Sequence, residues 1–311
     1  MKEKKENSRI KNISLIILNY NGFEETEKLT LDLCSWDKDI LEYHIIIVDN
    51  CSTDGSYMKL KKKFSKKSQV DVICTEYNGG YSYGNNYGVK FALKKYRPEY
   101  IAICNPDIIL NQEMLLQLLK TFDVDEKIGM CAPVMKMPDG YYSIHAITLP
   151  TFEDDLRSCS LRNNPQNVNR DHYQTIDDEK NLILTEMLPG SFFVIKSDVF
   201  LKIGMFDDKV FLYCEERIIG NKLKQAGYLA VTRADLFFIH AHAVTVRKSL
   251  TTIKSQKILL KSRLYYQKKY NGISGVQALF LHFRSNIYIC KLTLLLGVNK
   301  IRQRGMAKCL S

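Results

Sequence analysis

The sequence predicts an α/β protein: a mostly parallel central sheet with helices on both faces, followed by a basic helical appendage. Short β-branched runs alternate with stretches of helical spacing, as in strands joined by helical crossovers. Three of these runs end in polar residues, and ligands bind outside the carboxyl ends of strands in open α/β sheets. We expect the 311 residues to divide into a sheet domain at 1–248 and an appendage at 249–311.

The first half contains four expected strands: Ile13–Leu18, His44–Val48, Val70–Cys74 and Tyr100–Cys104. Between the first two, Glu24–Trp36 is rich in Glu, Leu and Lys and is expected to be a helix. Another predicted helix places Val89, Leu93 and Tyr96 at positions i, i+4 and i+7 of one face.

The second half begins with an irregular stretch, 138–180, in which Asp, Asn, Arg and Ser dominate. Such a composition predicts an excursion or lid over the crevice with sparse order. Order is expected to return with a strand at Ser191–Ile195. A helix over Glu215–Ala226 should then stop at Gly227, because glycine commonly ends helices.

The positive charge of the chain is confined to its last part. Residues 246–311 contain 14 Lys or Arg and no Asp or Glu, which leaves a net charge of −3 for the first 245 residues out of +11 in total. This asymmetry predicts that the tail contacts a polyanionic surface. Arg284 and Lys291 interrupt its most apolar part, Ala278–Val298, so we expect a helix in a membrane interface and no spanning helix.

The N-terminus is too polar for a signal peptide, and none of the nine cysteines forms a Cys-x-x-Cys pair. Both features indicate a cytoplasmic protein with reduced thiols.

Asn105-Pro106-Asp107 follows the fourth predicted strand. Proline forces a turn there, so Asp107 is expected to project into the crevice. Its carboxylate suits a hard divalent cation, Mg²⁺ or Mn²⁺, that also binds substrate phosphates. The structural alternative is that Asp107 caps the helix predicted at Gln112.

A glycine-rich motif spans Asn78 to Asn86. Gly79 and Gly80 would permit close approach of the backbone to a ligand, and the helix that follows presents its N-terminus to an anion. The chain has neither a Gly-x-Gly-x-x-Gly after its first strand nor a Gly-x4-Gly-Lys-Ser/Thr loop. At Asp54-Gly55, simple turn chemistry is the better interpretation.

These motifs, in this order and joined by Glu215-Glu216, resemble the nucleotide-sugar half of family 2 glycosyltransferases, the inverting GT-A enzymes. Rhamnosyl- and galactosyltransferase-like members of polysaccharide assembly are most similar. The resemblance covers Ile13–Lys248 with a gap near 138–180. It implies a metal-dependent enzyme that moves a sugar from a UDP- or dTDP-sugar to an acceptor hydroxyl.

The resemblance also implies roles for individual residues. Asn19 and Tyr20 would flank the base, and Asp49 would bind its ring. The full set of implied nucleotide-sugar contacts is Asn19, Tyr20, Asn21, Asp49, Asn50, Asn78, Gly79, Gly80, Asn85, Asn105 and Asp107. Glu216 matches the second acid of the family's pair, the catalytic base, although Glu215 competes for that role. As a structural alternative, the two acids would only favour a helix N-terminus.

On the acceptor side, the resemblance implies contacts from Pro189 and Gly190. His240 and His242 would join Asp107 as metal ligands, because imidazole suits Mn²⁺. A buried, hydrogen-bonded histidine is an equally good interpretation of either one.

The expected acceptor is a glycan, lipid-linked at the inner face of the membrane, with an anionic membrane surface as partner of the tail. One rival class is a metal-dependent nucleotidyltransferase, which would need a glycine-rich loop directly after the first strand. The other is a nucleic-acid-binding protein that uses the basic tail. The charge balance of the first 245 residues argues against the latter, so no nucleic acid is expected as a partner.

Overall fold

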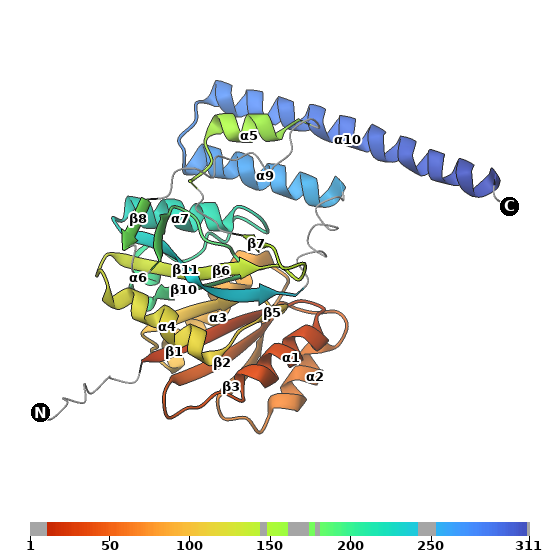
Figure 1. Ribbon diagram of the computed structural model, residues 1–311. Coiled ribbons are helices and arrows are strands. Elements are labelled where there is room, and N and C mark those ends of the chain that lie inside the picture. Colours follow the sequence, from red (N-terminus) through yellow and green to blue (C-terminus); the bar gives the residue numbers. More distant parts are fainter. Residues whose placement is uncertain (1–10, 144–147, 161–173, 178–180, 242–252, 310–311) are drawn as a thin grey trace, which may run out of the picture.

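The computed structural model describes residues 11–143, 148–160, 174–177, 181–241 and 253–309. Within these residues, eleven strands form one sheet in the order β3-β2-β1-β4-β10-β6-β11-β9-β8, with β5 beside β11 and β7 beside β6. Helices cover both faces of the sheet, and two long C-terminal helices lie together above it (Figure 1). The predicted α/β class with C-terminal helices is confirmed.

One half of the sheet consists of four parallel strands, and all four match predicted ones: β1 (Asn12–Asn19), β2 (Glu42–Asp49), β3 (Val70–Cys74) and β4 (Tyr100–Cys104). Asn19 pairs in register with Asp49, and Asp49 with Cys74. Parallel strands end at the same edge of a sheet, so the polar motifs that follow β1, β2 and β4 share one edge. We call it the carboxyl edge.

The other half of the sheet was mostly not predicted. Its strands are β5 (Ile108–Ile109), β6 (Ile128–Lys136), β7 (Tyr142–Ser143), β8 (Gln174–Asp177), β9 (Leu182–Thr185), β10 (Phe192–Lys196) and β11 (Leu229–His240). β10 is antiparallel to both β4 and β6, whereas β11 runs parallel to β6. The carboxyl ends of β6 and β11 therefore extend the carboxyl edge beyond β4.

Two hydrophobic clusters fill the space between the sheet and its helices. The first cluster packs α1 (Phe23–Leu33), α2 (Ser56–Phe64), α4 (Gln112–Leu119) and the 3-10 helix η1 (Lys120–Asp123) on one face. The second packs α3 (Gly80–Lys95), α6 (Ser197–Lys202) and α7 (Glu215–Gln225) on the other. Because α3 begins at Gly80, most of the glycine-rich motif is helical and not a loop.

The stretch 138–180 is more ordered than predicted in its described part. Helix α5 (Phe152–Ser158) starts with a capping box between Thr151 and Asp154. It lies between α9 (Ile253–Lys269) and α10 (Gly275–Cys309) (Figure 1). Tyr266 of α9 is completely buried in a cluster with residues of α7 and of the segment before it. Helix α9 is therefore packed into the body of the protein.

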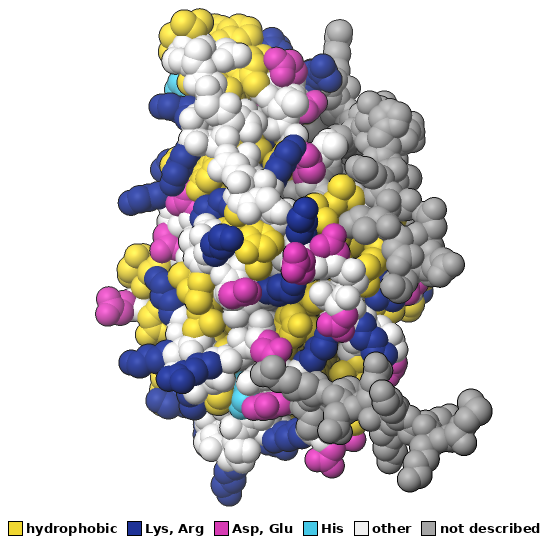
Figure 2. All heavy atoms as spheres, turned by 90° about the vertical axis from the view of Figure 1, so that its left-hand side faces the viewer, with side chains coloured by type: hydrophobic (Ala, Val, Ile, Leu, Met, Phe, Trp, Pro, Cys, Tyr) yellow, Lys and Arg dark blue, Asp and Glu magenta, His cyan; other side chains and the backbone are white. Residues whose placement is uncertain are grey.

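Helix α10 contains the one described segment that is long and apolar enough to cross a membrane, Gly275–Gly297, with a mean hydropathy of 1.2. The expectation that this segment lies in a membrane interface stays a prediction. Only 11% of its most apolar window is buried against the rest of the protein. In Figure 2, hydrophobic side chains gather where α10 begins, whereas acidic and basic side chains intermingle below.

Candidate active site

The ends of β1 and β2 are joined by buried polar side chains. Asn19 Nδ2 donates to Asp49 Oδ2 at 2.7 Å, and the Thr26 hydroxyl donates to Asn19 Oδ1 at 2.9 Å. The Ser52 amide donates to Asp49 Oδ1 at 2.8 Å. Asn19 and Asp49 have no exposed surface. Both side chains thus order the turns after β1 and β2, and their contact with a nucleotide stays a prediction.

The turns themselves hold an unusual backbone. Asn21 and Cys51 have φ angles of 53° and 60°, which non-glycine residues rarely adopt. Asn21 is held there because its Oδ1 accepts from the Thr53 amide at 2.8 Å. Tyr20, beside it, is 48% exposed and offers a flat aromatic face at the edge. The Asp54 carboxylate accepts from the Ser56 amide, so the preferred interpretation of Asp54 as a turn residue is confirmed.

The glycine-rich motif approaches the chain's own backbone. Gly80 has a φ of 84°, and a Cβ there would lie 2.0 Å from the carbonyl oxygen of Phe211. Asn50 fixes the start of the motif, since its Nδ2 donates to Asn78 Oδ1 at 3.0 Å and to the Gly80 carbonyl at 3.1 Å. The expectation that Gly80 makes room for a ligand is therefore corrected: it makes room for Phe211.

The other members of this motif are also engaged within the protein. A Cβ at Gly79 would collide with the Tyr83 side chain. Asn85 is 1% exposed in α3, and its Nδ2 donates to the Tyr81 carbonyl at 3.0 Å. In the described residues its Oδ1 has no hydrogen-bond partner.

Asp107 lies against His240. The His240 Nε2 atom is 3.1 Å from each carboxylate oxygen of Asp107. Strand β5 positions the pair, because Ile108 pairs with His240 and the Ala241 amide donates to the Asp107 carbonyl at 2.8 Å. The helix after Asp107 is capped by Asn111, whose Oδ1 accepts from the Met114 amide. The capping alternative for Asp107 is therefore wrong.

The Asp107–His240 pair fits a divalent cation that takes its other ligands from substrate and water. A carboxylate and an imidazole are suitable donors for Mn²⁺. The buried Nδ1 of His240 has no partner among the described residues. No group of three or more His, Cys, Asp or Glu that could hold a metal occurs in that part of the chain. His242 lies outside the described residues. The backbone of Asn105 is held by a hydrogen bond from its backbone amide to the Ser191 carbonyl.

Glu215 and Glu216 open helix α7 behind a strained turn. Tyr213 and Cys214 both have a φ of 69°, and such strain commonly occurs at functional sites. Glu216 lies directly on Gly190, where a Cβ would be 2.7 Å from its Oε1. The Tyr81 hydroxyl donates to the Gly190 carbonyl at 2.5 Å. The structure thus brings together the acidic pair, the Pro189-Gly190 segment and the glycine-rich motif.

The two glutamates are electrostatically unequal. Burial, and then the charge of Glu216, raise the pKa of Glu215 well above its usual range. Burial also raises the pKa of Glu216, but backbone hydrogen bonds and the Arg217 guanidinium oppose the rise. Glu215 is 6% exposed and its Oε2 has no partner in the described residues. Glu216 therefore ionises first, while Glu215 stays protonated.

A buried ion pair behind Glu216 was not predicted. Arg217 Nη1 contacts Asp155 Oδ1 at 2.9 Å, and Gln267 Nε2 donates to Asp155 Oδ2 at 2.8 Å. Asp155 belongs to α5 and Gln267 to α9, so this carboxylate ties both helices to α7. The sequence signal was the capping box of Thr151 and Asp154, which marks the start of a helix.

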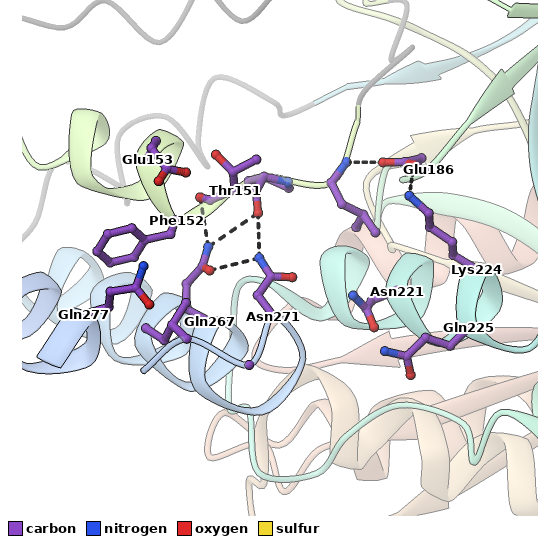
Figure 3. A pocket seen from close by; sticks show the side chains of 14 residues that line it. Thr151, Phe152, Glu153, Glu186, Asn221, Lys224, Gln225, Gln267, Asn271 and Gln277 are labelled. Atoms are coloured by element: carbon purple, nitrogen blue, oxygen red, sulfur yellow. Dashed lines mark hydrogen bonds and ion pairs between the residues drawn. The ribbon is translucent and has the colours of Figure 1, made fainter. Parts of the chain in front are cut away.

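A cavity of about 610 Å³ lies away from the carboxyl edge, near the C-terminal end of α7 (Figure 3). The ion pair of Glu186 with Lys224 lies on one side of it. On the other side, Gln267 donates to the carbonyl oxygens of Pro150 and Thr151 at 3.4 and 3.0 Å. None of the predicted site residues that the structure describes lines it. The cavity separates packed helices and is distinct from the candidate active site.

Comparison with known proteins gives a family for this arrangement. The family model of Glycosyl transferase family 2 matches residues 14–204. The rhamnosyltransferase WbbL of Escherichia coli is 24% identical over 252 residues, covering 74% of this chain and 92% of that protein. The low-salt glycan biosynthesis hexosyltransferase Agl10 of Haloferax volcanii is 27% identical over 214 residues, covering 68% of this chain and 62% of that protein.

Solved structures share the fold at lower identity. The mannosyltransferase PcManGT of Pyrobaculum calidifontis, in complex with GDP-Man and Mn²⁺, has a TM-score of 0.59 at 15% identity. The alignment covers 98% of this chain and 82% of that one. GalNAc-T7 with UDP, GalNAc and Mn²⁺ has a TM-score of 0.56 at 14% identity, covering 76% and 44%. These neighbours are GT-A glycosyltransferases, as the sequence motifs implied.

Proposed function

Because the chain belongs to glycosyl transferase family 2, we propose that it is an inverting, metal-dependent enzyme of cell-surface polysaccharide synthesis. It moves a sugar from a UDP- or dTDP-sugar to a hydroxyl of a glycan acceptor. One observation carries this proposal: Glu216 and the Asp107–His240 pair lie at one edge of the sheet. Family membership also favours this function over the nucleotidyltransferase and nucleic-acid-binding alternatives.

The nucleotide lies at the ends of β1 and β2. The exposed ring of Tyr20 provides a stacking face for the base, as aromatic side chains do for nucleobases in general. Asp49 and Asn19 hold the turns that shape this end, and a base contact with Asp49 would use the lone pairs that its internal hydrogen bonds leave free.

Asp107 and His240 would hold the divalent cation, with the diphosphate of the donor as a further ligand. Bound there, Mg²⁺ or Mn²⁺ would neutralise the charge that develops on the leaving diphosphate. The Mn²⁺ in the complexes of PcManGT and GalNAc-T7 supports a cation of this class.

Glu216 removes the proton from the acceptor hydroxyl. The hydroxyl oxygen then attacks the anomeric carbon, and the nucleoside diphosphate leaves from the opposite side, which inverts the configuration. A general base works best when its pKa lies near the operating pH, and burial moves the pKa of Glu216 in that direction. Gly190 has no side chain, so Glu216 can lie close to the segment that faces the acceptor.

The acceptor is lipid-linked, and the enzyme works in the cytoplasm at the inner face of the membrane. The support is the exposed apolar surface of α10 together with the acid-free tail. The pathway rests on relatives such as Agl10, whose name gives a hexosyltransferase of glycan biosynthesis.

A donor-turnover screen tests the proposal. Wild-type protein with Mn²⁺ should release UDP or dTDP from a panel of nucleotide sugars, and Asp107→Ala should abolish this release. Asp54→Ala is the matched control, because Asp54 only shapes a turn after β2 and should leave metal-dependent nucleotide affinity intact. Unchanged metal-dependent nucleotide affinity of Asp107→Ala in calorimetry would remove Asp107 from the site.

A further inference from the structure

Three side chains at the carboxyl edge form a patch that none of the assignments above uses. Lys136, Tyr142 and Phe237 come from the ends of β6, β7 and β11, and we call them the Lys136 patch. Lys136 pairs in register with Tyr142 across the β6–β7 hairpin, and β11 flanks β6. The Lys136 ammonium lies 5.1 Å from the centroids of both rings, which meet edge to face at 5.9 Å.

The patch is preformed and accessible. Its hairpin is closed by a hydrogen bond from the Met137 amide to the Tyr141 carbonyl at 2.8 Å, and Asp139 caps the turn. Tyr142 and Phe237 are each 45% exposed, so their rings face solvent although they belong to ordered strands. Among the described residues no carboxylate forms an ion pair with Lys136. Two aromatic faces and an ammonium are therefore available to a ligand.

The patch lies on the same face of the sheet as the catalytic base. Along β6, Lys136 lies an even number of residues from Met130 and Ala132, so its side chain is on the same face of the sheet as theirs. Met130 and Ala132 pack in one cluster with Ile219 and Leu223 of α7. Glu216 precedes these two residues by three and seven positions, so it shares their side of the helix.

His240 lies on the other face. It is two residues after Phe238 in β11, and Phe238 belongs to the cluster on the opposite side of the sheet. The donor diphosphate is thus assigned to the side of Asp107 and His240, and the Lys136 patch to the side of Glu216.

We propose that the Lys136 patch binds the acceptor, and that the acceptor is a glycosyl phosphate or diphosphate. The inference rests on the proposed function and names the acceptor chemistry of the same site. The C–H face of a sugar ring packs on aromatic side chains, while an ammonium pairs with a phosphate oxygen. An acceptor sugar on Tyr142 and Phe237 with its phosphate at Lys136 would present a hydroxyl towards Glu216.

The test compares two acceptors that differ only in phosphate. One is octyl N-acetylglucosaminyl diphosphate, and the other is octyl N-acetylglucosaminide without phosphate. Lys136→Gln should raise the KM for the diphosphate acceptor about fivefold or more, because one ammonium–phosphate pair is lost. The KM for the octyl glycoside and the affinity for UDP with Mn²⁺ should not change.

Lys202→Gln is the matched control, because Lys202 also lies over a tyrosine ring, that of the half-buried Tyr228, but at the opposite edge of the sheet. It should leave both acceptors unaffected, whereas Tyr142→Ala and Phe237→Ala should weaken both. Equal effects of Lys136→Gln on the two acceptors would overturn the phosphate assignment, and lost UDP affinity would place Lys136 on the donor side.

Binding of the diphosphate probe is also measured without turnover, by calorimetry with UDP present. If the wild-type protein turns over no nucleotide sugar, the proposed function fails, and this titration still decides the Lys136 patch. Equal affinity of wild type and Lys136→Gln for the probe would overturn the inference by itself.

Discussion

At the residue scale, the two neighbouring glutamates of α7 carry the same carboxyl group but meet different surroundings. Glu215 is buried, with one oxygen that has no partner among the described residues, whereas Glu216 is half-buried and contacts Gly190. Two like charges this close titrate as a pair, and the more buried member keeps its proton to higher pH. The family resemblance alone favoured Glu216 as the catalytic base, and the surroundings of its carboxylate also support this proposal.

We expect Glu216→Gln to lower sugar transfer by about 10²–10⁴-fold, the usual contribution of a general base. Donor affinity, measured by calorimetry with UDP or dTDP and Mn²⁺, should stay at the wild-type level. In wild type, kcat should rise with pH through the raised pKa of Glu216, because only the ionised carboxylate accepts a proton.

Glu215→Gln is the matched variant and should retain most of the activity, since Glu215 is already neutral. If Glu215→Gln is inactive while Glu216→Gln is near normal, the base is the other acid.

At the element scale, α5 and α9 are fastened to α7 by one buried carboxylate. Asp155 is 2% exposed and contacts Arg217, Arg263 and Gln267. Removing one partner of a buried ion pair leaves the other charge uncompensated in a poorly solvated place.

Asp155→Asn is therefore expected to reduce the free energy of unfolding by about 3–5 kcal/mol. Urea denaturation followed by circular dichroism measures this loss. Lys63→Ala, which breaks the more exposed Lys63–Glu27 pair, should cost at most about 1 kcal/mol and serves as the control. Equal costs for the two variants would mean that Asp155 does not hold these helices.

A second carboxylate makes the attachment of α9 sensitive to acid. Burial alone would raise the pKa of Asp207, but hydrogen bonds from Lys269, Tyr270 and Tyr265 hold it well below its usual range. A carboxyl whose folded-state pKa is depressed contributes stability above its unfolded value of 3.8, and that contribution is lost as pH falls below it.

Asp207→Asn should thus cost about 1.5–3 kcal/mol at pH 7, as expected for hydrogen bonds to a charged group. The difference from wild type should shrink as the pH is lowered below 3.8. Denaturation of both proteins at pH 7, 4 and 3 measures it, and a difference independent of pH would show that the charge of Asp207 contributes nothing.

At the scale of the whole molecule, the parallel half of the fold could be predicted and the other half could not. Strands β1, β2 and β4 are largely buried on both faces and contain continuous apolar runs, which a sequence displays directly, and the edge strand β3 is a short β-branched run. Strand β11 instead carries Arg233 and Asp235 at a register shift, and its partners β6 and β9 are distant in sequence. Local patterns hold no information on such pairings.

The candidate site was likewise predictable only where its residues stand in local sequence motifs. Asp107 and Glu216 were predicted because they stand in motifs next to clear elements. The contacts of Gly190 with Glu216, of Asp155 with Arg217 and of Lys136 with two rings join segments that only the folded chain brings together. The role of Gly80 was misread for the same reason, since Phe211 occupies the space that was expected for a ligand.

The structure also shows that part of the basic tail packs into the protein, which the sequence did not indicate. Arg263 and Lys269 of α9 form ion pairs with Asp155 and Asp207, respectively. These two charges therefore attach α9 to the rest of the protein. Leu281 and Ser285 of α10 are buried as well. A truncation near residue 246 would remove these contacts and is expected to unfold the protein. Apolar side chains are exposed near the start of α10, at Val276, Leu279, Phe280 and Phe283, and again at Leu294, Leu295 and Leu296. The part that can be removed without losing these buried contacts begins near Lys291.

A protein that ends at residue 290 should therefore bind UDP with Mn²⁺ normally but bind anionic vesicles more weakly than the full chain. Residues 291–311 contain five Lys or Arg and no acid, and each basic group near a membrane surface contributes up to about 1 kcal/mol. Co-sedimentation of the full chain with phosphatidylserine vesicles should weaken as salt rises, because salt screens these charges. Equal sedimentation of both proteins would refute docking through this segment. Strong, salt-independent binding of the full chain to neutral vesicles would instead identify apolar insertion of α10.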